Sequence, residues 1–157
     1  MIAFCCALAL PMVAHSQAIP APARTESKPP MTAQAKGSFD VQMKPESAPD
    51  DPVGRFSLTK QFHGDIDGTS VGEMLAVGNP SGSAGYVAME RVTGTVRGKS
   101  GSFALQHTGT MDNGHPSLSI KTVPGSGTGD LTGIVGELTL EITGGKHNYV
   151  FSYSLPK

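Results

Sequence analysis

The sequence predicts an all-β protein, an eight-stranded antiparallel up-and-down β-barrel. Apolar and polar residues alternate with a period of two along eight segments, a pattern typical of strands that bury one face. Short turns rich in Gly, Asn or Asp separate most of these segments, and 20 of the 157 residues are glycine. No segment after the first twenty or so residues keeps the period of an amphipathic helix.

The eight expected strands share this alternation and lie within the ranges 36–44, 56–63, 68–78, 85–96, 102–111, 117–123, 136–143 and 147–155. Hairpin turns are expected at 65–68, 97–101, 112–116 and 144–145, and a longer turn at 124–136. Consecutive strands joined in this way form a meander, and closing the meander into a barrel removes its exposed edges. A two-sheet sandwich is the alternative, but it usually needs a long crossing connection. The only long connection besides 124–136 is the proline-containing loop after the first strand.

The chain divides into three parts. Residues 1–18 have the pattern of a secretory signal peptide, with an apolar run followed by the small residues Ser16 and Ala18 before an expected cut after Ala18. Residues 19–34 are a Pro/Ala-rich stretch, which predicts a flexible linker. Residues 35–157 form the expected barrel domain. The protein is therefore expected to be secreted or periplasmic.

Charge and cysteine content restrict the partners. The formal net charge is −1, so nothing in the charge balance favours nucleic acid. The apolar run at the start is shorter than the roughly 20 residues that a membrane span requires. Cys5 and Cys6 both lie in the expected signal peptide, which leaves no thiol after cleavage. We therefore expect no disulfide, no cysteine-based zinc site and no cysteine nucleophile. We also expect no cofactor.

A metal site is not expected either. His63, Asp65 and Asp67 lie close together in the sequence, but they fall at a strand end and in a hairpin turn, where Asp is favoured for backbone reasons. The chain also lacks the HExxH spacing of zinc proteases.

Three residues are candidates for acid–base chemistry: Glu90, Glu73 and His107. Alternation places Glu90 on one face with Tyr86, and His107 on one face with Phe103. If these faces point inward, carboxylates from two neighbouring strands line one cavity, with Lys60, Arg91 or His107 close enough to hold down their pKa values. The alternative is that the two glutamates face solvent and that His107 is an ordinary core histidine. A slip of one residue in the face assignment would exchange inward for outward residues.

Apolar side chains on the same faces are expected to form the walls of the interior. The predicted ligand-binding residues are Lys60, Phe62, Met89, Phe103, Tyr149, Phe151 and Tyr153, with Phe39 and Met74 as further wall residues.

Three long segments of the chain resemble a bacterial family of unknown function. They are KQFHGDIDGTSVGEML, GSAGYVAMERVTGTVRGKSGSFALQHTGTMD and PSLSIKTVPGSGTGDLTGIVGELTLEI. The resemblance covers about residues 35–156 and implies an eight-stranded barrel similar to that of allene oxide cyclase, a plant enzyme that cyclises an unstable fatty-acid epoxide. No catalytic motif of the cyclase aligns with this sequence, so the resemblance carries no catalytic role.

Three functions remain open at this point. The first is a binding protein that holds a small apolar or amphipathic molecule inside the barrel, which at eight strands is just wide enough for one small ligand. The second is a cofactor-free isomerase or cyclase-like enzyme that uses Glu90 or Glu73 as the acid–base group and His107 as its partner. The third is a filled barrel with a role in protein contact. A homo-oligomer is compatible with each of them.

Overall fold

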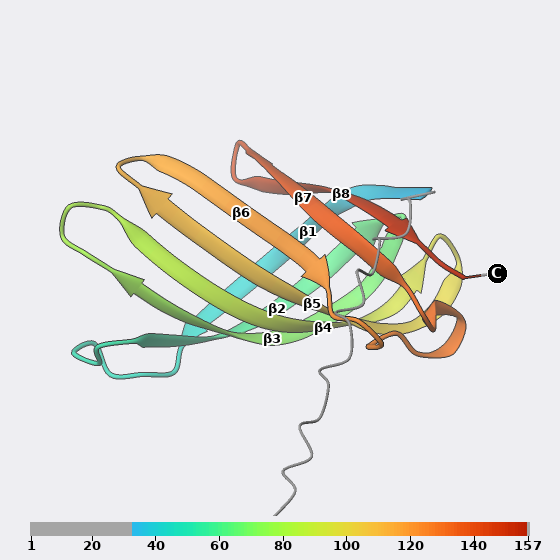
Figure 1. Cartoon of the computed structure of the whole chain (residues 1–157), viewed down its shortest axis with the longest axis horizontal. Coiled ribbons are helices and arrows are strands. Elements are labelled where there is room, and N and C mark those ends of the chain that lie inside the picture. Colours follow the sequence, from blue (N-terminus) through green and yellow to red (C-terminus); the bar gives the residue numbers. More distant parts are fainter. Residues whose placement is uncertain (1–32, 157) are drawn as a thin grey trace, which may run out of the picture.

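Eight antiparallel strands follow one another along the chain and close into a barrel (Figure 1). The computed structural model describes residues 33–156. The strands are β1 (Ala33–Pro45), β2 (Gly54–Gly64), β3 (Ile66–Gly78), β4 (Ala84–Val96), β5 (Lys99–Asp112), β6 (His115–Thr122), β7 (Val135–Thr143) and β8 (Lys146–Ser154). Each pairs with its neighbours in sequence, and β1 also pairs with β8. The predicted fold class is confirmed.

Each expected strand is present, and its ends differ from the expected ones by a few residues at most. β1 begins at Ala33, so Ala33 and Gln34 belong to the barrel rather than to the linker. The rest of the expected linker and the expected signal peptide lie outside the described residues. The long turn between β6 and β7 contains one short 3₁₀ turn, Gly129–Leu131. Residues 33–156 include no helix that is long and apolar enough to cross a membrane.

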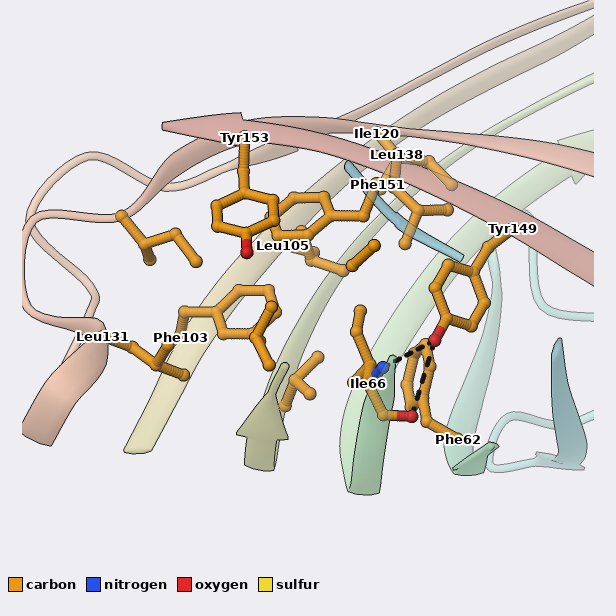
Figure 2. Close-up of a cluster of buried hydrophobic side chains, with 14 of the residues drawn as sticks. Phe62, Ile66, Phe103, Leu105, Ile120, Leu131, Leu138, Tyr149, Phe151 and Tyr153 are labelled. Carbon is orange, nitrogen blue, oxygen red and sulfur yellow. Dashed lines mark hydrogen bonds between the residues drawn. The ribbon is translucent and has the colours of Figure 1, made fainter. Parts of the chain in front are cut away.

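One half of the barrel interior is filled by packed side chains (Figure 2). Phe103 and Tyr153 lie on either side of Phe151, with ring centroids 5.4 and 5.2 Å from it, and both pairs are nearly parallel. Leu131, from the turn after β6, is buried at the same end of the barrel. The remaining buried apolar residues of this core are Ala35, Phe39, Phe62, Ile66, Val92, Val96, Leu105, Ile120, Ile134, Leu138 and Tyr149.

Tyr149 ties β8 to the turn between β2 and β3. Its hydroxyl accepts a hydrogen bond from the Ile66 N–H at 2.9 Å and lies 3.4 Å from the Ile66 carbonyl oxygen (Figure 2). The carbonyl oxygen of His63 is also 3.4 Å away. Gly37 lies beneath this contact, where a Cβ would come within 2.6 Å of the tyrosine oxygen. A buried backbone N–H needs a partner, and here a side chain from across the barrel supplies it.

The other half of the barrel is open. Its inward-facing side chains include Met43, Met111, Leu118 and Ile142, and all four are exposed. The barrel wall is weakest between β6 and β7, where Lys121 and Glu137 form the one paired position. The two strands diverge from there toward the open end (Figure 1). The open half is therefore lined by apolar residues that solvent can reach.

Candidate functional site

A buried cluster of charged and polar side chains lies between the filled and the open halves. Glu90 on β4 forms an ion pair with Lys60 on β2, with 2.5 Å between Lys60 Nζ and Glu90 Oε2. His107 on β5 brings its Nε2 to 3.1 Å from the same oxygen. The side chains of all three are almost inaccessible to solvent. We call these three residues, together with Ser70 on β3, the buried cluster.

Strand register explains why these residues meet. Glu90 lies opposite Gly72 on β3 and Leu105 on β5. Relative to Glu90, His107 is one inward-facing position closer to the open end of the barrel. Lys60 and Ser70 lie opposite each other, one inward-facing position closer to the filled end than Glu90. Gly72 matters here because a Cβ at this position would lie 2.9 Å from the Glu90 Cα. The glycine lets β3 and β4 approach closely beside the carboxylate.

The ionised form of Glu90 is strongly favoured. Burial acts to raise the pKa of Glu90, but the His107 ring, the Lys60 ammonium and the Ser70 hydroxyl outweigh it and lower this pKa from 4.5 to about 2. The Lys60 ammonium also lies 4.5 Å from the centre of the Phe39 ring, which adds a cation–π contact. At neutral pH, Glu90 is a weakly basic, fully charged carboxylate.

Three polar atoms of the cluster have no hydrogen-bond partner among residues 33–156: Ser70 Oγ, Glu90 Oε1 and His107 Nε2. The His107 nitrogen is within ion-pair distance of Glu90 Oε2, but the geometry is not that of an aligned hydrogen bond, so we treat it as an electrostatic contact. Buried polar atoms are almost always satisfied in proteins. Three unsatisfied atoms on adjacent strands therefore mark this cluster as a candidate site.

A pocket of about 330 Å³ opens at the wide end of the barrel, above the cluster. We call it the mouth pocket. Apart from Gly85, Thr110 and Ser117, its lining consists of inward-facing apolar or small residues of β3, β4, β5 and β6 and the phenol Tyr86. They are Met74, Ala76, Ala84, Tyr86, Gly109, Met111, Pro116 and Leu118. This size is within the range of small-molecule sites.

Tyr86 connects the mouth pocket to the buried cluster. It is on the same face of β4 as Glu90, and its ring packs on Gly109, where a Cβ would lie only 2.2 Å from a ring carbon. Burial, followed by the negative charge of Glu90, raises the pKa of Tyr86. His107 is also close to the pocket, since it is the inward-facing residue that comes immediately before Gly109, a pocket residue, on β5. The cluster therefore lies directly below the pocket.

The structure corrects two of the expected site residues. Glu73 and Met89 lie opposite each other on β3 and β4, and both side chains are exposed on the outer surface. The prediction that they line the interior is wrong. Glu90 points inward and pairs with Gly72, so the neighbouring pair of Glu73 and Met89 points outward. One residue of register puts the two glutamates on opposite faces of the sheet.

The other expected site residues do face inward. Glu90, His107 and Lys60 come together in the buried cluster. Phe62, Phe103, Tyr149, Phe151 and Tyr153 are buried against one another in the filled half, so they form packed core there, while other residues line the mouth pocket. Ser70 was not expected at the site, although it shares its face of β3 with Gly68 and Gly72, and this run of small residues predicts a close approach of strands.

The residues first considered for metal binding are used in turns and at the surface. His63 Nε2 lies 3.0 Å from an oxygen of Asp40, and Asp65 accepts a hydrogen bond from the Lys36 N–H at 2.9 Å. Within residues 33–156, no group of three or more His, Cys, Asp or Glu side chains is arranged to hold a metal ion.

Comparison with known proteins places the chain in a family. Residues 35–153 match the model of a family described as protein of unknown function (DUF3224). The chain belongs to this family. A solved structure from Shewanella oneidensis MR-1, a DUF3224 protein of unknown function, is 42% identical and superimposes with a TM-score of 0.74 over 80% of this chain and 98% of that one. A search of curated proteins finds no match.

Family membership shows the fold and leaves the activity open. The expected resemblance to a family of unknown function is thus confirmed. Any activity of this DUF3224 protein depends on its own side chains, because one fold can serve unrelated functions.

Replacing Glu90 with Gln should lower the free energy of unfolding by about 3–5 kcal/mol, because Lys60 would remain buried without its counter-ion. Urea unfolding at pH 7 measures this change. The double variant Glu90→Gln/Lys60→Met should recover most of the loss. Glu73→Gln is the matched control: this exposed glutamate on the neighbouring strand should change stability by less than about 0.5 kcal/mol.

The same variants give a pH signature. The folded-state pKa of Glu90 is lowered to about 2, so its contribution is complete above about pH 4.5 and is lost as pH falls from there toward 2. This loss amounts to something on the order of 3 kcal/mol. This loss of stability in acid should be absent from Glu90→Gln/Lys60→Met and present in the parent protein and in Glu73→Gln. Equal acid sensitivity of these three proteins would show that Glu90 is not held ionised by its neighbours.

Proposed function

We propose that this DUF3224 protein binds a small apolar or amphipathic molecule in the open half of its barrel. The mouth pocket carries the proposal: inward-facing residues such as Leu118 and Met111 are exposed there, whereas the other half of the interior is filled. Exposed apolar side chains around a concave site are typical of ligand-binding surfaces. The filled half gives this site a rigid base.

The pattern of residues 1–18 supports the periplasm or the exterior of the cell as the place of binding. There the protein would meet small apolar molecules outside the cytoplasm, as a carrier or a receptor for them.

The buried cluster favours binding over acid–base catalysis. A general base works best with a pKa near the working pH, whereas the pKa of Glu90 is about 2. Glu73, the other candidate carboxylate, lies on the outer surface. A fixed ion pair below an apolar pocket is better suited to orienting a bound molecule than to moving protons.

Binding can be tested with N-phenyl-1-naphthylamine, an uncharged probe whose fluorescence rises in apolar sites. The chain has no tryptophan, so its own emission interferes little. Leu118→Asp should weaken probe binding about tenfold or more, because the bound probe would cover the new carboxylate and remove it from water. Leu75→Asp is the matched control, since Leu75 on the outer surface is 46% exposed and Leu118 is 43% exposed.

The probe should bind the Leu75→Asp protein as it binds the parent protein. If Leu118→Asp leaves probe binding unchanged, the mouth pocket is not the binding site and the proposed function fails.

The outer face of β3 and β4 supports a second candidate function, contact with another copy of this chain. Val71, Leu75 and Val77 on β3 and Val87 and Met89 on β4 form an exposed apolar group, which we call the outer patch. Glu73 and Arg91 flank its centre on diagonal positions of the two strands. A two-fold axis through such a patch brings the glutamate of one copy against the arginine of the other.

The variant Leu75→Asp also tests this second function. At the micromolar concentrations of a sedimentation velocity experiment, the parent protein and Leu118→Asp should sediment as dimers, and Leu75→Asp should sediment as a monomer. A monomeric parent protein would rule out the outer patch as a contact between copies, and ligand binding would remain the function.

A further inference from the structure

The unsatisfied atoms of the buried cluster restrict the chemistry of the ligand. Glu90 Oε1 has no partner among the described residues, and neither does Ser70 Oγ. Both residues are more than nine-tenths buried. The Ser70 hydroxyl also contributes to the low pKa of Glu90, so the two side chains are close to each other. A group that extends from the mouth pocket to the cluster would meet the unpartnered oxygen of Glu90, with the Ser70 hydroxyl one inward-facing position deeper.

We infer that the ligand is a neutral, medium-chain alcohol whose hydroxyl reaches the buried cluster while its apolar chain occupies the mouth pocket. This inference rests on the proposed function. The alcohol donates its hydrogen bond to Glu90 Oε1 and accepts one from the Ser70 hydroxyl. Both unsatisfied oxygens then gain a partner, and a hydrogen bond to a charged acceptor is stronger than one between neutral groups.

The charges of the cluster exclude the two charged alternatives. A carboxylate head would have to lie against the free oxygen of Glu90, which is itself ionised. An ammonium head would meet the Lys60 ammonium, which already neutralises Glu90. In either case a like charge would be brought into a site shielded from solvent, where such repulsion is strong. An ether of the same length lacks the donor that Glu90 Oε1 requires.

The dimensions of the barrel fit an elongated molecule. Glu90 lies two inward-facing positions below Tyr86 on β4, and each such step along a strand is about 7 Å. Between them, the inward-facing residue of β4 is Ala88, and Gly72 lies beside Glu90 on β3. Met74 on β3 and His107 on β5 lie opposite Ala88, so an unbranched chain that extends from the pocket to the carboxylate would pass between these two side chains.

A head-group series tests the inference. Decanol, methyl decyl ether, decanoate and decylamine would each compete with N-phenyl-1-naphthylamine for the full-length mature protein at pH 7. Decanol should bind about tenfold or more tightly than each of the other three. Ser70→Ala should reduce decanol affinity several-fold and leave the affinity for N-phenyl-1-naphthylamine, which has no oxygen to accept the serine hydrogen bond, unchanged.

Thr69→Ala, an exposed position on the same strand, is the matched control and should not change either affinity. Ser70→Ala should lower the urea midpoint only slightly, because the serine hydroxyl is the smallest of the contributions that lower the pKa of Glu90, while His107 and Lys60 remain.

The outcomes separate the two proposals. Equal binding of all four compounds would overturn the alcohol assignment and leave the apolar pocket intact, with a water molecule in place of the hydroxyl. Tightest binding of decanoate or decylamine would also overturn it. If neither the probe nor any of the four compounds binds, the proposed function fails and the alcohol assignment fails with it.

Discussion

A carboxylate inside a barrel must be neutralised, and the neutralisation of Glu90 by Lys60 organises this interior. The pair joins β2 to β4 across β3, and His107 extends the contact to β5. Removing a charge from water is expensive, so these strands are held in one register by the need to keep the three side chains together. The consequence is a polar layer at a fixed height in an otherwise apolar barrel.

This layer separates two kinds of interior. Toward the turns between β2 and β3 and between β4 and β5, aromatic side chains from β1, β2, β5 and β8 fill the space, and the turn after β6 covers it with Leu131 and Ile134. Toward the other end, small residues such as Gly109 and Ala76 leave room, and the larger apolar side chains are exposed. An eight-stranded barrel has space for side chains or for one small ligand, and this one is filled by side chains in one half and open to solvent in the other.

Much of the fold can be read from the sequence because alternation and turn chemistry are local signals. The strands and their order follow from the period of two and from the glycine-rich turns, and the inward orientation of Glu90 and His107 follows from their apolar neighbours on β4 and β5. Three basic side chains, Lys60, Arg91 and His107, are candidates in the sequence to neutralise Glu90, and Lys60 and His107 are the two that contact it.

Local signals fail where both faces of a strand look alike. On β3, the apolar residues Val71, Leu75 and Val77 point outward, while the inward face carries Gly68, Ser70 and Gly72. Hydrophobicity therefore assigned Glu73 to the wrong face. The division into filled and open halves also escapes the sequence, because it depends on the register between β6 and β7 and on which aromatic rings meet across the barrel.

We propose that the open half of the barrel holds a small molecule above the buried ion pair. Native mass spectrometry of the protein, purified without detergent from cells that produce it, can detect such a molecule. We expect a bound small molecule that is released on acid denaturation and that is missing from the protein when Leu118 is replaced by Asp. A mass equal to that of the polypeptide alone, before and after addition of excess decanol, would contradict it.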